Sequence, residues 1–124
     1  MKRFAPVLVV VASLLSIPST APASPTPFDS YCSPTGDFCQ GLYRQGGVRA
    51  KLSTFSFRGS YELCVRSRRT GNDCKRFQLR TSSDGIYVGS VSLARHFDIG
   101  AHGRYAVAWT YGGSRIGKKL HFSK

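Results

Sequence analysis

The amino-acid sequence predicts an all-β protein, an immunoglobulin-like sandwich of about six to seven antiparallel strands. From Gly46 onward, apolar residues alternate with polar ones almost to the end of the chain. Turn signals rich in glycine, proline, asparagine and aspartate separate these runs about every ten residues. No stretch of about ten residues or more shows the 3.6-residue period of an amphipathic helix. Together these observations favour two packed antiparallel sheets.

The N-terminal region predicts export. A short basic start precedes an apolar run over residues 7–17, and Ala-Pro-Ala at 21–23 is typical of a signal-peptidase site. The apolar run is too short to cross a bilayer as a helix. We therefore expect residues 1–23 to be a cleaved signal peptide, and the mature chain to be secreted without a transmembrane segment.

The mature chain is expected to form a single domain with a strong positive charge. Residues 24–30 contain two prolines and no periodicity, which predicts a flexible lead-in to one β-sandwich domain over residues 31–124. The full chain has 18 Lys and Arg against six Asp and Glu, a formal charge of +12. Removing residues 1–23 removes two basic residues and no acidic one, which leaves +10. Such a charge favours anionic partners.

The four cysteines predict two disulfides, because small exported domains are commonly cross-linked in this way. Three pairings are possible. Cys32 and Cys39 flank a turn in which Pro34 presets φ and Gly36 permits positive φ, so a local bridge is geometrically natural.

The segment from Cys64 to Cys74 reads as a β-hairpin closed by the second disulfide. Both cysteines fall on the face opposite the apolar residues of their strands. The register that pairs Cys64 with Cys74 also pairs Tyr61 with Phe77 in the core. We therefore favour Cys32–Cys39 and Cys64–Cys74 over the two crossed pairings, with the hairpin bridge on the outward face.

The other strands are expected where alternation is clear. The alternation changes phase near residues 53–54, which predicts a bend there. In the less regular run 86–97, Val91 and Leu93 are the best core candidates. Clear alternation marks 48–53, 61–66, 74–80, 105–111 and 116–122. Tyr105 stands in the position of the tyrosine corner of immunoglobulin-like domains, whereas Val107 replaces their inter-sheet cysteine. The pattern thus supports a sandwich more than membership of the antibody-domain class.

An arginine-rich cluster on the disulfide hairpin is the candidate binding surface. Alternation puts Arg66, Arg76 and Arg80 on the outward face beside the bridge, as one flat patch, and Arg68 and Arg69 at the hairpin tip. Its residues are Arg66, Arg68, Arg69, Lys75, Arg76 and Arg80. Arginine suits bidentate contacts to phosphate or carboxylate. The alternative is a solvated basic face that protects exposed strands from edge pairing.

Other motifs are weak, and we expect no catalytic residue, metal or cofactor. Residues 112–119 nearly match a phosphate-binding loop, but Lys119 replaces its Ser or Thr and a strand pattern follows. His96, His102 and His121 are the neutral-pH acid–base candidates, and carboxylates that would support a metal site are scarce. No Gly-x-Ser-x-Gly occurs, and nothing resembles a sequence-specific nucleic-acid motif.

Several stretches resemble a group of small secreted actinobacterial proteins of unassigned function. They are Cys-Ser-Pro-Thr-Gly-Asp-Phe-Cys at 32–39, Tyr-Glu-Leu-Cys-Val-Arg at 61–66, Gly-Arg-Tyr at 103–105 with Trp109, and 112–122. The resemblance covers most of the mature chain and implies no catalytic or binding residues.

The leading hypothesis is a secreted, basic, non-enzymatic binding domain. Its expected partner is an anionic surface polymer or a protein, contacted through the arginine-rich hairpin. The alternative is a secreted inhibitor or effector that presents Arg68 and Arg69 to a protease or a competing cell. A third hypothesis, a hydrolase, would need a cleft that joins a histidine to a carboxylate.

Overall fold

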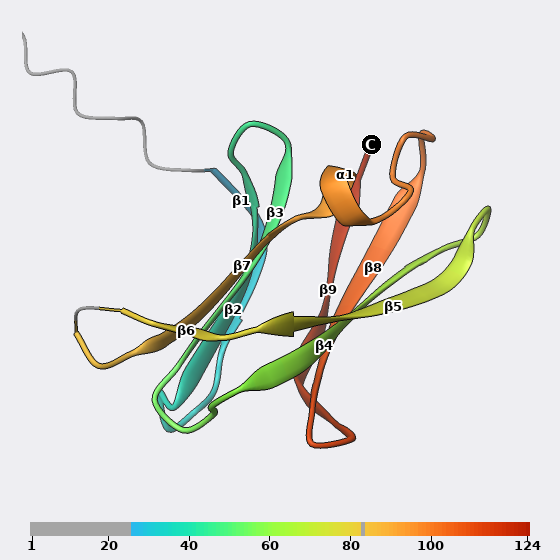
Figure 1. The fold of residues 1–124 in the computed structure, drawn as a ribbon. Coiled ribbons are helices and arrows are strands. Elements are labelled where there is room, and N and C mark those ends of the chain that lie inside the picture. Colours follow the sequence, from blue (N-terminus) through green and yellow to red (C-terminus); the bar gives the residue numbers. More distant parts are fainter. Residues whose placement is uncertain (1–25, 83) are drawn as a thin grey trace, which may run out of the picture.

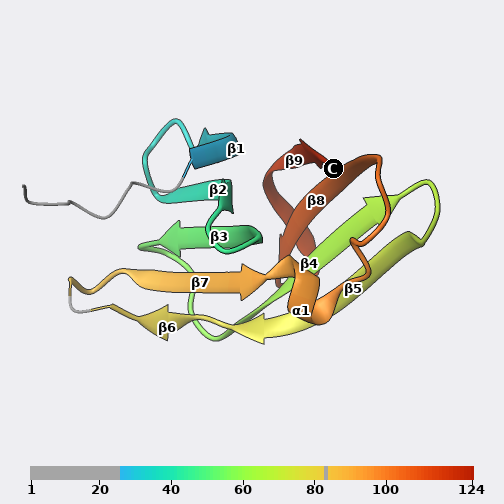
Figure 2. The same ribbon diagram turned by 90° about the horizontal axis from the view of Figure 1, so that it is seen from above.

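The computed structural model describes residues 26–82 and 84–124, which form two antiparallel β-sheets and one short helix (Figures 1 and 2). The expected signal peptide, residues 1–23, lies outside the described residues. The two sheets face one another as the layers of a sandwich, as Figure 2 shows from above. The all-β prediction is confirmed.

The first sheet has five strands and the second has four, all paired antiparallel within the described residues. In sheet order, the first contains β1 (Thr26–Cys32), β2 (Phe38–Arg44), β3 (Val48–Thr54), β7 (Tyr87–Ser92) and β6 (Arg80–Thr81). The second contains β5 (Gly71–Gln78), β4 (Ser60–Ser67), β8 (Arg104–Tyr111) and β9 (Ser114–Ser123). A single turn of helix, α1 (Leu93–His96), follows β7.

The core lies between the sheets and follows the alternation of the strands. In β3 and β4 every second residue is buried, as the period-two pattern predicted. Trp109 of β8 is fully buried at the centre, and Tyr61 and Leu63 of β4 are also in the core. The expected core residues Val91 and Leu93 are buried as well.

Both predicted disulfides are present. Cys32–Cys39 closes the turn between β1 and β2, and Cys64–Cys74 joins β4 to β5. The hairpin register is the predicted one, because Tyr61 pairs with Phe77 and their ring centroids are 6.0 Å apart. One register thus serves the outward bridge and the inward aromatic pair.

The strand order can be compared with that of immunoglobulin-like domains. In the first sheet, the strand order β2-β3-β7-β6 corresponds to the A-B-E-D order of immunoglobulin-like domains, with β1 added at the edge. In the second sheet, β5-β4-β8-β9 corresponds to C′-C-F-G. The Tyr105 hydroxyl donates to the carbonyl oxygen of Ala101 at 2.6 Å, the type of bond made by a tyrosine corner. The immunoglobulin-like assignment stays a prediction, which this order supports.

The expected flexible lead-in, residues 24–30, is wrong from Thr26 onward, because β1 begins there. β1 is an edge strand with an irregular register between Pro27 and Asp29. Edge strands and bulges tolerate proline, so a proline-rich sequence does not exclude a strand here. Phe28, at the irregularity, packs against Phe122 with 6.1 Å between ring centroids.

The described residues contain nine strands, more than the six to seven expected. β2 was missed because Gln40, Gly41 and Leu42 are buried in succession, which removes the alternation. The predicted strand 74–80 is divided, since Leu79 leaves the second sheet and Arg80 joins the first as β6. Strands that switch sheets in this way form the corners of sandwiches.

The opposite edge of the sandwich is closed by side chains of the first sheet. β1 lies beside β9, and the β8–β9 register shifts between Val107 and Trp109. There the buried Gln40 amide donates to the Ile116 carbonyl at 3.3 Å and accepts from the Lys118 N–H at 2.9 Å. An irregular strand thus keeps its backbone groups satisfied.

Candidate functional site

A cleft of about 800 Å³ lies between the tip of the β4–β5 hairpin and the loop that precedes β8. Both segments are at the end of the molecule that also carries the C-terminus (Figure 1). The basic residues that line the cleft are Arg66, Arg68, Arg69, His102, Arg104 and His121. Among the described residues, no aspartate or glutamate lines it. The lining of the cleft therefore gathers four guanidinium groups and no side-chain carboxylate.

The sheet register brings these cations together. Arg66 of β4 pairs with Ala106 of β8, and Ala106 pairs with His121 of β9. The three residues form one row across the outward face. Because alanine is short, the middle of the row is hollow, with the arginine and the imidazole as its walls.

The hairpin tip holds Arg68 and Arg69 in a tight turn. The hydroxyl oxygens of Ser67 and Thr70 are 2.6 Å apart, and the Thr70 N–H donates to the Ser67 hydroxyl at 3.1 Å. Gly71 follows with φ of 71°, a conformation that glycine adopts without strain. The two arginines are thus presented by a turn with internal hydrogen bonds.

The opposite wall is tied to the end of the chain. Gly103 exchanges two backbone hydrogen bonds with Lys124, at 3.0 and 2.9 Å. The Tyr105 hydroxyl donates a hydrogen bond to the carbonyl oxygen of Ala101 in the same loop. These bonds hold His102 in a braced loop and Arg104 at the start of β8, so the cleft has two ordered sides.

The structure brings together Arg66, Arg68 and Arg69 of the predicted cluster and separates the others. Lys75 lies on the inward-facing register of β5 opposite Leu63 and does not line the cleft. Its Nζ donates to the carbonyl of His96 and lies 5.4 Å from the Phe97 ring centroid. Lys75 therefore fastens α1 to β5.

Arg76 and Arg80 also lie outside the cleft. Arg76 faces outward on β5 opposite Glu62, beyond the disulfide. Arg80 belongs to β6 of the first sheet and lines a smaller pocket with Phe77. The expectation that Arg66, Arg76 and Arg80 form one flat patch is wrong, because the chain changes sheets at Leu79.

Sequence reasoning did not place Arg104, His102 and His121 in the site. Arg104 is two residues before Ala106, so alternation alone could have put it on the outward face. Bringing that face to the hairpin requires the β4–β8 pairing, which joins distant segments. His96 does not line the cleft and packs edge-on against Phe77, with 5.1 Å between the ring centroids.

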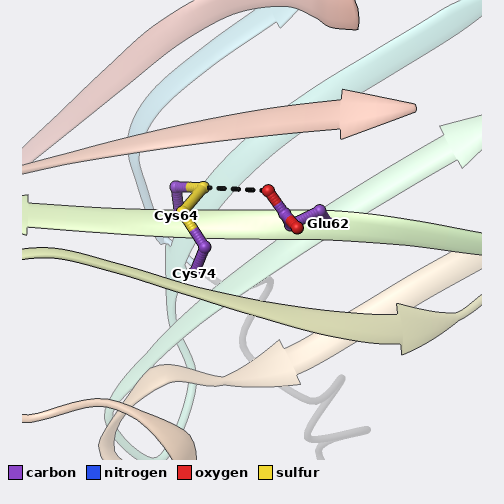
Figure 3. A group of neighbouring side chains, drawn as sticks. All are labelled: Glu62, Cys64 and Cys74. Carbon is purple, nitrogen blue, oxygen red and sulfur yellow. Dashed lines mark hydrogen bonds between the residues drawn. A yellow bond between two sulfur atoms is a disulfide. The ribbon is translucent and has the colours of Figure 1, made fainter. Parts of the chain in front are cut away.

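A second cluster surrounds the hairpin disulfide. Glu62 Oε1 lies 3.6 Å from Sγ of Cys64, beside the bond to Cys74 (Figure 3). These three residues have the donor types of a metal site within 4.8 Å of one another. Metals bind the thiolate form of cysteine, so two sulfurs joined in a disulfide do not provide that ligand set. The cluster marks instead where a carboxylate interrupts the basic face.

Within the described residues, no helix has the length and apolar character needed to cross a membrane. No protein-family model, curated protein or solved structure matches the chain.

Proposed function

We propose that the protein is an extracellular, non-enzymatic binding domain that holds an anionic surface polymer in the cleft beside the β4–β5 hairpin. The convergence of Arg66, Arg68, Arg69 and Arg104 without a lining carboxylate carries this proposal. Guanidinium groups that face one another repel, and an anion between them removes that repulsion. Their planar donors suit phosphate and carboxylate oxygens.

Two disulfides within a small chain support an extracellular location, because such bonds persist in oxidising compartments. The charge of +10 on the chain without residues 1–23 supports attraction to polyanions over the whole surface. The cleft adds a defined place where that attraction becomes contact.

The inhibitor alternative has weaker support. A peptide that adds to a protein as a strand is bound in an extended conformation. Arg68 and Arg69 lie in a turn fixed by the Ser67–Thr70 contacts, so presenting them in extended form requires opening that turn.

The decisive experiment measures binding of the disulfide-bonded mature chain to immobilised anionic polymer over a salt series. We expect Arg66→Ala with Arg104→Ala to weaken binding by about tenfold or more at low salt, since charge-assisted bonds are worth about 1.5–3 kcal/mol each. Arg80→Ala with Arg95→Ala removes the same charge elsewhere and should have a much smaller effect. Equal losses from the two double variants would reduce the interaction to nonspecific charge and overturn the proposal.

A further inference from the structure

The outward face of β8 continues the floor of the cleft toward the other end of the sheet. Ala106 lines the cleft, and Ala108 and Thr110 follow on the same face at two-residue intervals. All three side chains are half-buried and short. β8, one of the two inner strands of this sheet, thus has a row of small residues between strands that carry longer ones.

Cations continue along the β9 side of this row. His121 lines the cleft, and alternation puts Lys119 on the same face. Beyond the irregularity in β9, Arg115 pairs with Thr110 at the far end of the row. Basic residues therefore accompany β8 from the cleft to the β8–β9 turn.

The β4 side of the row has a different charge. Beyond Arg66 come the Cys64–Cys74 bridge and then Glu62, which pairs with Thr110 from the other side. Glu62 is the one carboxylate at the outward positions of the four strands of this sheet. An extended anion would be repelled by Glu62 and attracted to Lys119 and Arg115.

The length of the row distinguishes a compact ligand from a linear one. Outward residues recur about every 6.8 Å along an antiparallel strand, so Arg104 to Thr110 extends over roughly 20 Å. A compact anion can contact only the cleft. A chain with a charge at every repeat can contact the cleft and Arg115 at once.

We propose that the cleft is one end of a linear track along β8, and that the ligand is an extended phosphate polymer that runs from Arg66 and Arg104 past Lys119 to Arg115. This inference rests on the proposed function and adds the ligand's shape and direction. The outward residues of the track recur at a regular interval, which suits a polymer with a charge at every repeat.

Two probes test the track, tripolyphosphate as the compact anion and long-chain polyphosphate as the linear one. We expect Lys119→Ala with Arg115→Ala to leave tripolyphosphate binding within about twofold. The same variant should weaken long-chain binding severalfold and lower the slope of log K against log salt by roughly one to two, as expected for two lost phosphate contacts. Arg49→Ala with Lys51→Ala removes the same charge from the outward face of the other sheet and is the matched control.

Glu62→Gln provides a test in the opposite direction. It keeps the shape of the side chain and removes its charge, so long-chain affinity should rise severalfold while tripolyphosphate affinity stays constant. If both probes respond alike to the track variants, or if the Arg49/Lys51 control weakens long-chain binding as much, the track is overturned and the cleft remains. If Arg66→Ala with Arg104→Ala leaves tripolyphosphate binding unchanged, the cleft itself fails.

Discussion

Gly117 shows how a single position fixes the irregular edge of β9. Its φ is +63°, and a Cβ added there would overlap Oε1 of Gln40 and lie 2.8 Å from Cε2 of Phe38. Gln40 is buried, and its amide holds both sides of the irregularity, so it cannot move away without losing two hydrogen bonds. The conformation and the contact therefore both select glycine.

We predict that Gly117→Ala destabilises the fold more than Gly113→Ala does. Gly113 also has a positive φ, 82°, but an added Cβ there meets no atom within 4 Å. Both variants incur the strain of about 1–2 kcal/mol for a left-handed residue, and Gly117→Ala adds overpacking of about 1–3 kcal/mol. Denaturant unfolding followed by the fluorescence of the single, buried Trp109 measures both. Equal losses would show that the Gln40 contact adds nothing.

The buried hydroxyl of Tyr61 makes the stability of the fold depend on pH in the alkaline range. Burial raises the pKa of Tyr61 from 10.0 to about 12. The hydroxyl of Tyr61 loses its proton at lower pH in the unfolded chain than in the folded chain. The contribution of Tyr61 to the free energy of unfolding is therefore complete below pH 10 and is lost as the pH rises from 10 towards 12. The whole loss amounts to about 2–3 kcal/mol.

The test compares wild type with Tyr61→Phe, which cannot ionise at this position. We expect the difference in unfolding free energy between the two proteins to shift in favour of the phenylalanine variant above about pH 10. A difference that stays constant across this range would contradict the assignment to Tyr61.

At the scale of elements, the sequence predicted what alternation and turn chemistry control. The β4–β5 register followed from one parity condition, because Cys64 with Cys74 and Tyr61 with Phe77 require the same pairing. β2 could not be found in this way, since the buried Gln40 takes an apolar position to satisfy backbone groups 76 and 78 residues away. α1 has a single turn, too short to show a helical period.

The Cys64–Cys74 bridge stabilises the hairpin that carries half of the cleft. We predict that Cys64→Ala with Cys74→Ala lowers the free energy of unfolding by about 2–3 kcal/mol, from the closed-loop entropy. The bridge is on the outward face, so its removal leaves no cavity in the core. Binding to anionic polymer should weaken less than with Arg66→Ala and Arg104→Ala, because β4 remains paired to β8. Complete loss of binding in a folded double-alanine variant would contradict this.

At the scale of the whole molecule, the candidate site was only half predictable. The density of arginine on the hairpin identified Arg66, Arg68 and Arg69 because they are close in sequence. The other wall, with Arg104 and His121, depends on the pairing of β4 with β8, which are far apart in the sequence. The change of sheet at Leu79 likewise removed Arg80 from the site.

The cleft links binding to global stability, which gives a final prediction. A phosphate ligand that binds the cleft only in the folded state stabilises the fold by RT ln(1 + [L]/Kd), about 2.7 kcal/mol at 100 times Kd. We expect tripolyphosphate to raise the unfolding midpoint of the mature protein well above its value in sodium chloride of the same ionic strength. In Arg66→Ala with Arg104→Ala the two salts should have nearly the same effect, because only general screening remains. A tripolyphosphate effect of full size in that variant would place the bound anion elsewhere on the basic surface.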